Sequence, residues 1–175
     1  MRRVRYGVAM SLDGYIAGPN GEADWIVMDP DIDFAAIFNR FDTVLVGRKT
    51  YDAMKAMGGY VSPSPGVQSV VVSRTMHQAD YPDLKIVNDA EPFITALKAG
   101  LGKDVWLFGG GVLFHSMLSA GLVDGIDVAV MPTLLGAGIP LLPAPGPLTR
   151  LSLKSHRIYE KTGIIGLEYD VLRSR

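Results

Sequence analysis

Twice along this chain an apolar run ends in glycine and a helical pattern begins directly afterwards. The first junction joins a strand predicted at 43–46, through Gly47, to apolar residues at helical spacing as far as Met57. The second joins a strand predicted at 104–108, through glycines 109–111, to a helix predicted at 112–120. Strands that alternate with helices in this way are typical of a mostly parallel sheet with helices on both faces. The sequence therefore predicts an α/β fold.

The other predicted elements complete a single domain spanning residues 1–175. A helical spacing runs from Ile32 to Phe41, and a second helix begins after Asn88 or Asp89, either of which can cap it, and ends near residue 99. The turn at 161–163 predicts an antiparallel hairpin at the C-terminal end of the chain. Further strands are predicted at 4–10, 67–73, 84–87, 126–131, 151–159 and 164–172.

Composition excludes several classes of site. The chain has no cysteine, so it has no disulfide, no thiol nucleophile and no Cys-ligated metal, and its three histidines are too far apart for an HExxH pair; we expect no metal site. A net charge of −1 gives no general attraction to nucleic acid or anionic membranes. The two uncharged stretches at 105–123 and 128–148 are interrupted by glycine or proline, and no signal-peptide core follows the N-terminus. We expect a soluble, cytoplasmic protein.

The candidate chemistry lies where predicted parallel strands end, because ligands bind beyond the carboxyl ends of such strands. The segment 47–50 (Gly-Arg-Lys-Thr) and the glycines 109–111 each open a helix, whose free N–H groups can bind a phosphate. Neither is a GxGxxG or P-loop motif, since Phe114 stands where a third glycine would be needed. The alternative is a pair of tight turns with solvated cations. Arg74 follows another strand, where a cation favours NADP over NAD.

These junctions in this order resemble the dihydrofolate reductase-like superfamily, and specifically stand-alone proteins similar to the C-terminal reductase domain of riboflavin biosynthesis enzymes. The resemblance implies a three-layer fold with a central, mixed, mostly parallel eight-stranded sheet. It also implies an NADPH-dependent reductase with a small-molecule substrate, and a homodimer. The segments that carry it are 9–17, Asp24-Trp25, 46–51, 70–74, 108–111 and 138–143.

Carried over by motif, the resemblance implies a set of cofactor-binding residues and a cis Gly109–Gly110 peptide bond. The nicotinamide carboxamide would be contacted by Ala9 and Ile16, and the phosphates by Arg48, Lys49 and Thr50. The adenosine 2′-phosphate would be contacted by Ser73 and Arg74, and the pyrophosphate by Gly110, Gly111, Val112 and Leu113. Gly47 and Phe108 complete the set.

For catalysis, the resemblance implies one carboxylate near the first helix. Its position relative to Gly47 selects Asp31, with Asp29 and Asp33 as rivals. The alternative is that all three acids merely complement the positive end of that helix. Trp25 is the second predicted catalytic residue.

The substrate class is narrowed by one departure from dihydrofolate reductases. Those enzymes carry, just after a Pro-x-Pro-Gly turn, an arginine that binds the folate carboxylate, whereas here Pro63–Gly66 is followed by Val67. We therefore expect a small heterocyclic or sugar-linked substrate, as for 5-amino-6-(5-phosphoribosylamino)uracil reductase. Dihydrofolate reductase activity and a non-catalytic NADP-binding protein are the alternatives. The zinc deaminase domain that often accompanies the riboflavin reductase needs cysteines, which this chain lacks.

Overall fold

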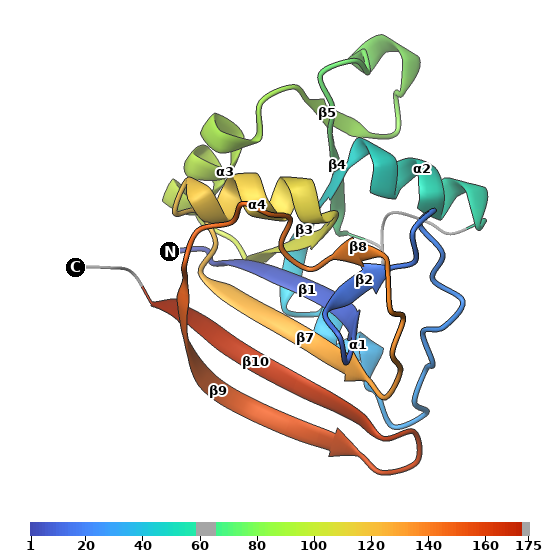
Figure 1. Ribbon diagram of the computed structural model, residues 1–175. Helices are drawn as coiled ribbons and strands as arrows, with labels where there is room; N and C mark the ends of the chain where they lie inside the picture. The colour runs from blue at the N-terminus through green and yellow to red at the C-terminus, as the bar shows by residue number, and fades with distance from the viewer. Residues whose placement is uncertain (59–65, 173–175) are drawn as a thin grey trace.

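Eight strands form one mixed sheet in the computed structural model, which describes residues 1–58 and 66–172 (Figure 1). The strands at the centre of the sheet have high β propensity, and their valine and leucine side chains supply much of the buried core. Across the sheet the order is β5 (Lys85–Val87), β4 (Gln68–Val72), β3 (Phe41–Gly47), β6 (Asp104–Gly109), β1 (Val4–Ser11), β7 (Gly125–Met131), β10 (Ile164–Leu172) and β9 (Arg150–Tyr159).

The first six strands in this order run parallel, and the last two are added through antiparallel pairing. β1 lies between β6 and β7, with Val4 opposite Val105 and Tyr6 opposite Ile126. β10 pairs antiparallel with both β7 and β9. The predicted mixed sheet and C-terminal hairpin are therefore confirmed. Because β3 and β6 are adjacent and parallel, their carboxyl ends are neighbours.

Helices cover both faces of the sheet. On one face α3 (Ala90–Ala99) and α4 (Gly111–Ser119) pack on the main core, where Tyr6 stacks on Phe114 with ring centroids 3.9 Å apart. On the other face α2 (Arg48–Ala56) packs through Tyr51 on Val46 and its neighbours. Burial of each such side chain stabilises the fold by about 1.5–3 kcal/mol. The predicted covering of both faces is confirmed.

The first helix is shorter than the sequence predicts. Helical spacing from Ile32 to Phe41 predicts a longer element, whereas α1 spans only Phe34–Phe38. Phe41 begins β3 instead, where it is 4% exposed and packs on Trp106 with ring centroids 5.6 Å apart. Pairing of β3 with β6 and burial of this ring outweigh the local helical pattern, because tertiary contacts override weak propensity.

Two short strands in segments read from the sequence as turns form a separate small sheet. β2 (Tyr15–Ala17) pairs antiparallel with β8 (Ile139–Pro140). Neither strand is long enough to show a periodicity of its own, and each depends on a partner more than a hundred residues away. A single 3-10 turn, η1 (Gln78–Asp80), lies between β4 and β5.

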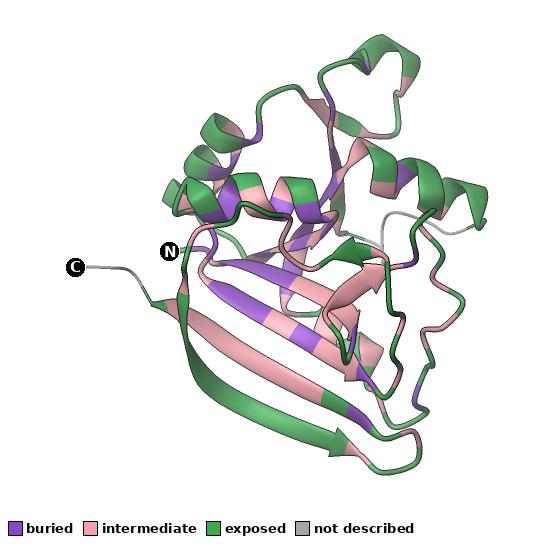
Figure 2. Cartoon of the chain, viewed as in Figure 1, coloured by how far each residue is buried: buried purple, intermediate pink, exposed green. Residues whose placement is uncertain are grey.

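The middle of the sheet and its β9 edge differ in how far they are buried. Figure 2 shows the strands β1 and β7 with many buried residues and β9 exposed along nearly all its length.

Within the described residues, no helix is both long enough and apolar enough to cross a membrane.

Candidate functional site

The two glycine junctions that the sequence predicts as phosphate sites lie side by side. Val46 is the register partner of Gly109, so the ends of β3 and β6 are adjacent. A Cβ placed on Gly47 would lie 3.7 Å from the Gly109 carbonyl oxygen and 3.7 Å from the Gly110 nitrogen. A Cβ on Gly110 would lie 3.0 Å from Thr50 Oγ1. The Gly109–Gly110 bond is cis, which confirms that prediction.

Both helices that begin here start without a side-chain cap. Gly47 is the N-cap of α2 and Gly110 the N-cap of α4, and neither position can supply a capping side chain. The first N–H groups of an α-helix have no partner within the helix, and they carry the positive end of its dipole. Two such helix starts in contact fit the pyrophosphate of a dinucleotide, which is an anion with many acceptor oxygens.

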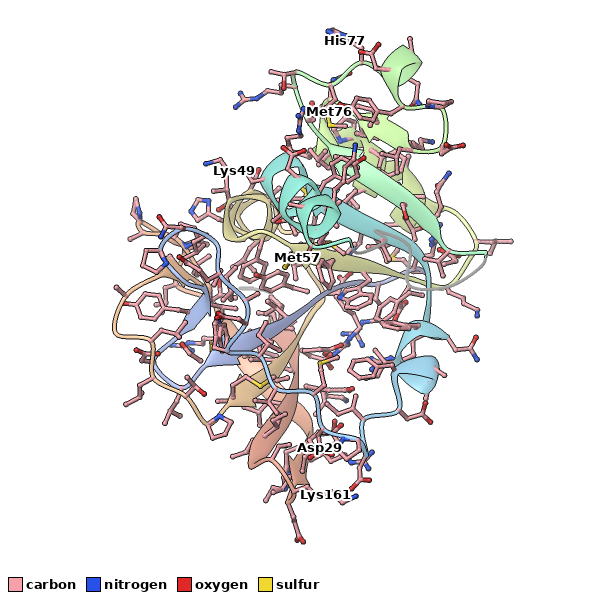
Figure 3. All side chains as sticks on the ribbon, turned by 90° about the vertical axis from the view of Figure 1, so that its right-hand side faces the viewer. Asp29, Lys49, Met57, Met76, His77 and Lys161 are labelled. Atoms are coloured by element: carbon pink, nitrogen blue, oxygen red, sulfur yellow. The ribbon has the colours of Figure 1, made fainter. Side chains whose placement is uncertain are left out.

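Cations stand beside these helix starts. Arg48 Nε donates to Asp52 Oδ2 over 2.7 Å, and this hydrogen bond to a carboxylate raises the pKa of Arg48. Lys49 is exposed and forms no ion pair with any residue in the described part of the chain. Figure 3 labels it on the ribbon of α2. The structure therefore leaves Lys49 free to meet a ligand phosphate.

The end of β4 carries the predicted 2′-phosphate pair. Ser73 is 5% exposed, and its hydroxyl accepts hydrogen bonds from the N–H groups of Thr75, at 3.2 Å, and Met76, at 3.1 Å. The hydroxyl thus holds the turn, and Arg74 in that turn is exposed. Among the described residues Arg74 has no ion-pair partner. Ser73 shapes the loop that presents Arg74, a role the sequence does not reveal.

The predicted nicotinamide contacts come from β1 and the small sheet. Ala9 is half-buried in β1 opposite Ala129 of β7, and Ile16 is half-buried in β2. The β8 segment lies against the start of α4, since a Cβ on Gly111 would be 3.0 Å from the Pro140 carbonyl oxygen. Gly111 is therefore needed for this close approach, while Val112 is exposed and Leu113 half-buried.

Asp13 fastens the loop after β1 to the loop after β7, a contact that sequence reasoning missed. Its carboxylate accepts from the Ser11 hydroxyl at 2.6 Å, from Gly136 N–H at 2.7 Å and from Leu135 N–H at 3.1 Å. These hydrogen bonds, the one from Ser11 first, hold the pKa of Asp13 below its ordinary value. Asp13 and Gly14 are visible in the sequence only as a turn, and nothing local indicates their distant partners.

The three candidate acids each have a different partner. Asp33 caps α1 by accepting from Ala36 N–H, as the alternative interpretation of this acid expects. Asp31 is exposed and its Oδ1 lies 2.8 Å from Lys161 Nζ. Asp29 is 2% exposed and accepts from the Thr162 hydroxyl at 2.7 Å.

The environment of Asp29 acts on its pKa in two directions. Burial raises the pKa, but the hydrogen bond from Thr162, the N–H of Asp31 and the charge of Lys161 together hold it below the ordinary value. In Figure 3 the labelled Asp29 and Lys161 lie far from Lys49. Asp29, which is held by the β9–β10 hairpin, is therefore well separated from the cationic helix start of α2.

Trp25 lies in the segment between β2 and α1. It is half-buried, and its indole N–H donates to the Glu22 carbonyl oxygen over 3.1 Å. Its assignment as a catalytic residue stays a prediction, as does that of Asp31.

Aromatic rings gather on the sheet face below α1. Phe38 stacks on Trp106 with centroids 5.3 Å apart, and Phe108 meets Trp106 edge to face at 5.0 Å. Trp106, Phe108 and Phe38 are all half-buried. The period-two placement of Trp106 and Phe108 in β6 is the sequence signal for this cluster, and Phe108 leads directly into Gly109.

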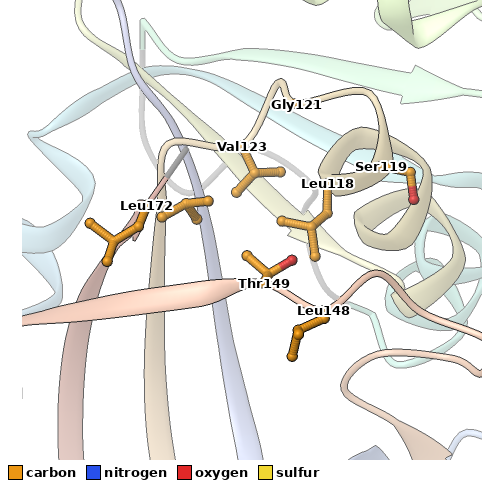
Figure 4. A pocket seen from close by; sticks show the side chains of 8 residues that line it. Leu118, Ser119, Gly121, Val123, Leu148, Thr149 and Leu172 are labelled. Carbon is orange, nitrogen blue, oxygen red and sulfur yellow. The ribbon is translucent and has the colours of Figure 1, made fainter. Parts of the chain in front are cut away.

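One surface groove lies well away from these junctions. It is formed where α4 ends and where β7 begins, and so at the opposite edge of the parallel strands (Figure 4). Its apolar walls include Leu118, Val123, Leu148 and Val171. The groove is thus separate from the candidate site. Among the described residues no group of three or more acidic or histidine side chains is arranged to hold a metal ion.

Sheet order, paired helix starts and C-terminal hairpin together define a dihydrofolate reductase-like α/β protein. The sequence profile of the RibD C-terminal domain family matches residues 2–164. The chain belongs to this family, whose members include reductase domains. The superfamily inferred from the sequence motifs is thereby confirmed.

Two relatives of similar length align with nearly the whole of this chain. The uncharacterized protein YyaP of Bacillus subtilis (strain 168) is 33% identical over 181 residues, which cover 96% of this chain and 94% of YyaP. A provisionally assigned riboflavin biosynthesis protein from Shewanella sp. PV-4 has a similar structure, with a TM-score of 0.81 and 25% identity over 99% of this chain and 100% of that one.

Two more distant structures agree in fold. The diaminohydroxyphosphoribosylaminopyrimidine deaminase/5-amino-6-(5-phosphoribosylamino)uracil reductase of Thermotoga maritima gives a TM-score of 0.73 at 15% identity, over 98% of this chain but 57% of that enzyme. Dihydrofolate reductase from Enterococcus faecalis, solved with NADP(H), gives 0.71 at 16% identity, over 98% of this chain and 97% of that one. Both support the predicted dihydrofolate reductase-like fold.

Proposed function

We propose that this chain is an NADPH-dependent reductase of a small heterocyclic or sugar-linked compound, similar to 5-amino-6-(5-phosphoribosylamino)uracil. The observation that carries the proposal is the contact between two uncapped helix starts, at Gly47 and Gly110. Family membership and the names of two structural relatives support a reductase of this kind.

The residues around these helix starts would hold the cofactor. Backbone N–H groups at 48–50 and 111–113 would bind the pyrophosphate, with Lys49 adding charge. Arg74 would pair with the 2′-phosphate, and Ala9 and Ile16 would orient the nicotinamide carboxamide. Phe108, the last side chain before the glycines, would line the site. When bound, NADPH supplies the hydride.

Substrate activation is the task of the segment that follows β2. We assign Asp31 as the group that holds a proton for the substrate, with Asp29 and Asp33 as its rivals, and Trp25 as a neighbour that excludes water. Val67 packs against the buried cluster that contains Val46 and Tyr51, and it supplies no charge for a folate carboxylate. The turn at Pro63 and Pro65 lies outside the described residues.

Cofactor preference is the direct test. We expect fluorescence titration of the purified chain to give tighter binding of NADPH than of NADH, because Arg74 pairs with the extra phosphate. Arg74→Ala should reduce NADPH affinity about tenfold and leave NADH affinity unchanged, as a lost charge-assisted hydrogen bond is worth about 1.5–3 kcal/mol. Arg150→Ala, on the exposed strand β9, is the matched control.

A preference for NADH, or an Arg74→Ala variant with unchanged selectivity, would overturn the 2′-phosphate assignment. Steady-state assays with NADPH then separate the candidate activities. Turnover of an aminopyrimidine ribityl or ribosyl substrate supports the proposal, rapid reduction of dihydrofolate favours the alternative enzyme, and tight NADPH binding with no turnover favours a non-catalytic protein.

The proposal includes a homodimer and a cytoplasmic location. The β9–β10 hairpin supports the dimer, since it exposes apolar side chains on one face: Leu151, Leu153, Ile158 and Ile165 are 39%, 51%, 61% and 39% exposed. Exposed apolar patches of this kind mark protein interfaces. Light scattering on the purified chain measures the oligomeric state directly.

A further inference from the structure

The segment 18–33 carries both predicted catalytic residues, and in the described part of the chain its hydrogen bonds to sequence-distant residues lie at one place. Within the described chain, all its hydrogen bonds to distant residues go to the β9–β10 hairpin. They come from the Thr162 hydroxyl to Asp29, from Lys161 to Asp31 and, at 3.4 Å, from Arg157 to the Asp31 carbonyl oxygen. The hairpin thus decides where this segment lies.

Among these contacts, the one at Asp29 is buried and the others are exposed. Asp29 is 2% exposed, and its two oxygens connect the segment 18–33 to the hairpin; we call this connection the joint. Oδ1 accepts from Asp31 N–H at 2.8 Å, and Oδ2 accepts from the Thr162 hydroxyl at 2.7 Å. Lys161 and Asp31 are 61% and 52% exposed, so solvent screens their attraction. Asp29 and Thr162 are therefore the fixed part of the joint.

The hairpin is a firm support for this joint. Gly163, with φ of +75°, allows the tight turn, and its N–H donates to the Tyr159 carbonyl oxygen at 2.8 Å. Ile164, directly after the turn, is 0% exposed, and β9 and β10 pair from Tyr159 to Arg150. The position of Thr162 is thus fixed by the hydrogen-bonded turn at Gly163 and by the buried side chain of Ile164.

We infer that Asp29 and Thr162 are positioning residues, through which the β9–β10 hairpin fixes Asp31 and Trp25 for the reaction. The inference rests on the proposed function in assigning a reaction to this segment. It removes Asp29 from the candidate proton donors, because both oxygens of its carboxylate already hold the joint. It also gives the β9–β10 hairpin a role in the active site.

Fluorine NMR tests the joint without any turnover. The chain has two tryptophans, so labelling with 5-fluorotryptophan gives two resonances, which Trp25→Phe assigns. Thr162→Val removes the hydroxyl donor and keeps the size of the side chain. We expect the Trp25 resonance to shift or broaden, while that of Trp106, held in the aromatic cluster of β6, stays in place.

Two controls keep this test specific. Thr162→Ser retains the hydroxyl and should restore the original Trp25 resonance. Thr95→Val removes a hydroxyl of the same kind from α3, where it donates to the Glu91 carbonyl oxygen, and should leave both resonances unchanged. An unchanged Trp25 resonance in Thr162→Val, or no restoration by serine, would overturn the inference.

The kinetic readout separates positioning from cofactor binding. In Thr162→Val we expect kcat to fall about tenfold or more, because small misplacements of reacting groups are costly, with the dissociation constant for NADPH changed less than about twofold. A moved Trp25 resonance with unchanged kcat would refute the positioning role. Failure of the unaltered chain to bind NADPH would instead refute the proposed function. The fluorine spectra would still test whether the contact between Thr162 and Asp29 positions Trp25.

Discussion

The α-helices of the described chain begin in two different ways. α1 and α3 start at Asp33 and Asp89, whose carboxylates accept hydrogen bonds from the N–H groups of Ala36 and Glu91. α2 and α4 start at glycines, without any side-chain cap. The capped helices start away from the two glycine junctions, while the uncapped pair meets there.

The capped helix starts contribute to folding stability, whereas the uncapped starts leave N–H groups for a ligand. A capping aspartate contributes about 1 kcal/mol to folding and neutralises the positive end of the helix. At α2 and α4 the chain forgoes that contribution, and the N–H groups stay available for an anion. The absence of a cap at two adjacent helices is therefore a stronger sign of a ligand than either glycine alone.

Exchanging the two kinds of helix start should have the largest effect. Gly47 has extended backbone angles, and a Cβ there meets only ordinary contacts, so aspartate fits at this N-cap. We expect Gly47→Asp to weaken NADPH binding about 100-fold, because a carboxylate takes the N–H groups and repels the pyrophosphate. Folding stability should change by no more than about 0.5 kcal/mol. Fluorescence titration and urea unfolding measure the two quantities.

Gly47→Ala is the matched control, since it fills the same space without charge or cap. It should lose much less affinity than Gly47→Asp. Equal losses in the two variants would mean that space, and not the free N–H groups, matters at this helix start.

The reciprocal change belongs to α3. Asp89→Ala removes its cap and should lower the free energy of unfolding by about 1 kcal/mol, with NADPH affinity unchanged. Urea unfolding gives the first value and titration the second. Asp83→Ala, on the exposed loop before β5, should alter neither. A change in NADPH affinity in Asp89→Ala would break the proposed separation of roles.

A smaller effect is expected at Asp13, which binds N–H groups without capping a helix. Its pKa is lower than the ordinary 3.8, so its contribution to stability is present above that value and is lost as pH falls through the folded-state pKa. Asp13→Asn should therefore be less stable than the parent at neutral pH and should approach it as the pH falls through the folded-state pKa of Asp13. Urea unfolding across this range tests the slope; parallel profiles for variant and parent would contradict it.

Motifs at the strand ends allowed much of the candidate site to be predicted, and the register of β3 and β6 explains why. Gly47 and Gly109 each follow an apolar strand, and parallel strands bring their carboxyl ends to one edge. Contacts between loops could not be predicted in this way. Asp13 with Gly136, and Asp29 with Thr162, join residues more than a hundred positions apart, and short polar turns carry no periodicity that would pair them.

By itself, the sequence determined the class of fold and the chemistry available to it. Alternating apolar segments require a sheet covered by helices, and glycines at strand ends leave helix starts without caps. Tertiary structure alone decided that Phe41 extends a strand, that α2 and α4 start in contact, and that Asp29 is buried against a hairpin. The physical reason is range: propensity and capping act over a few residues, whereas burial and strand pairing join distant ones.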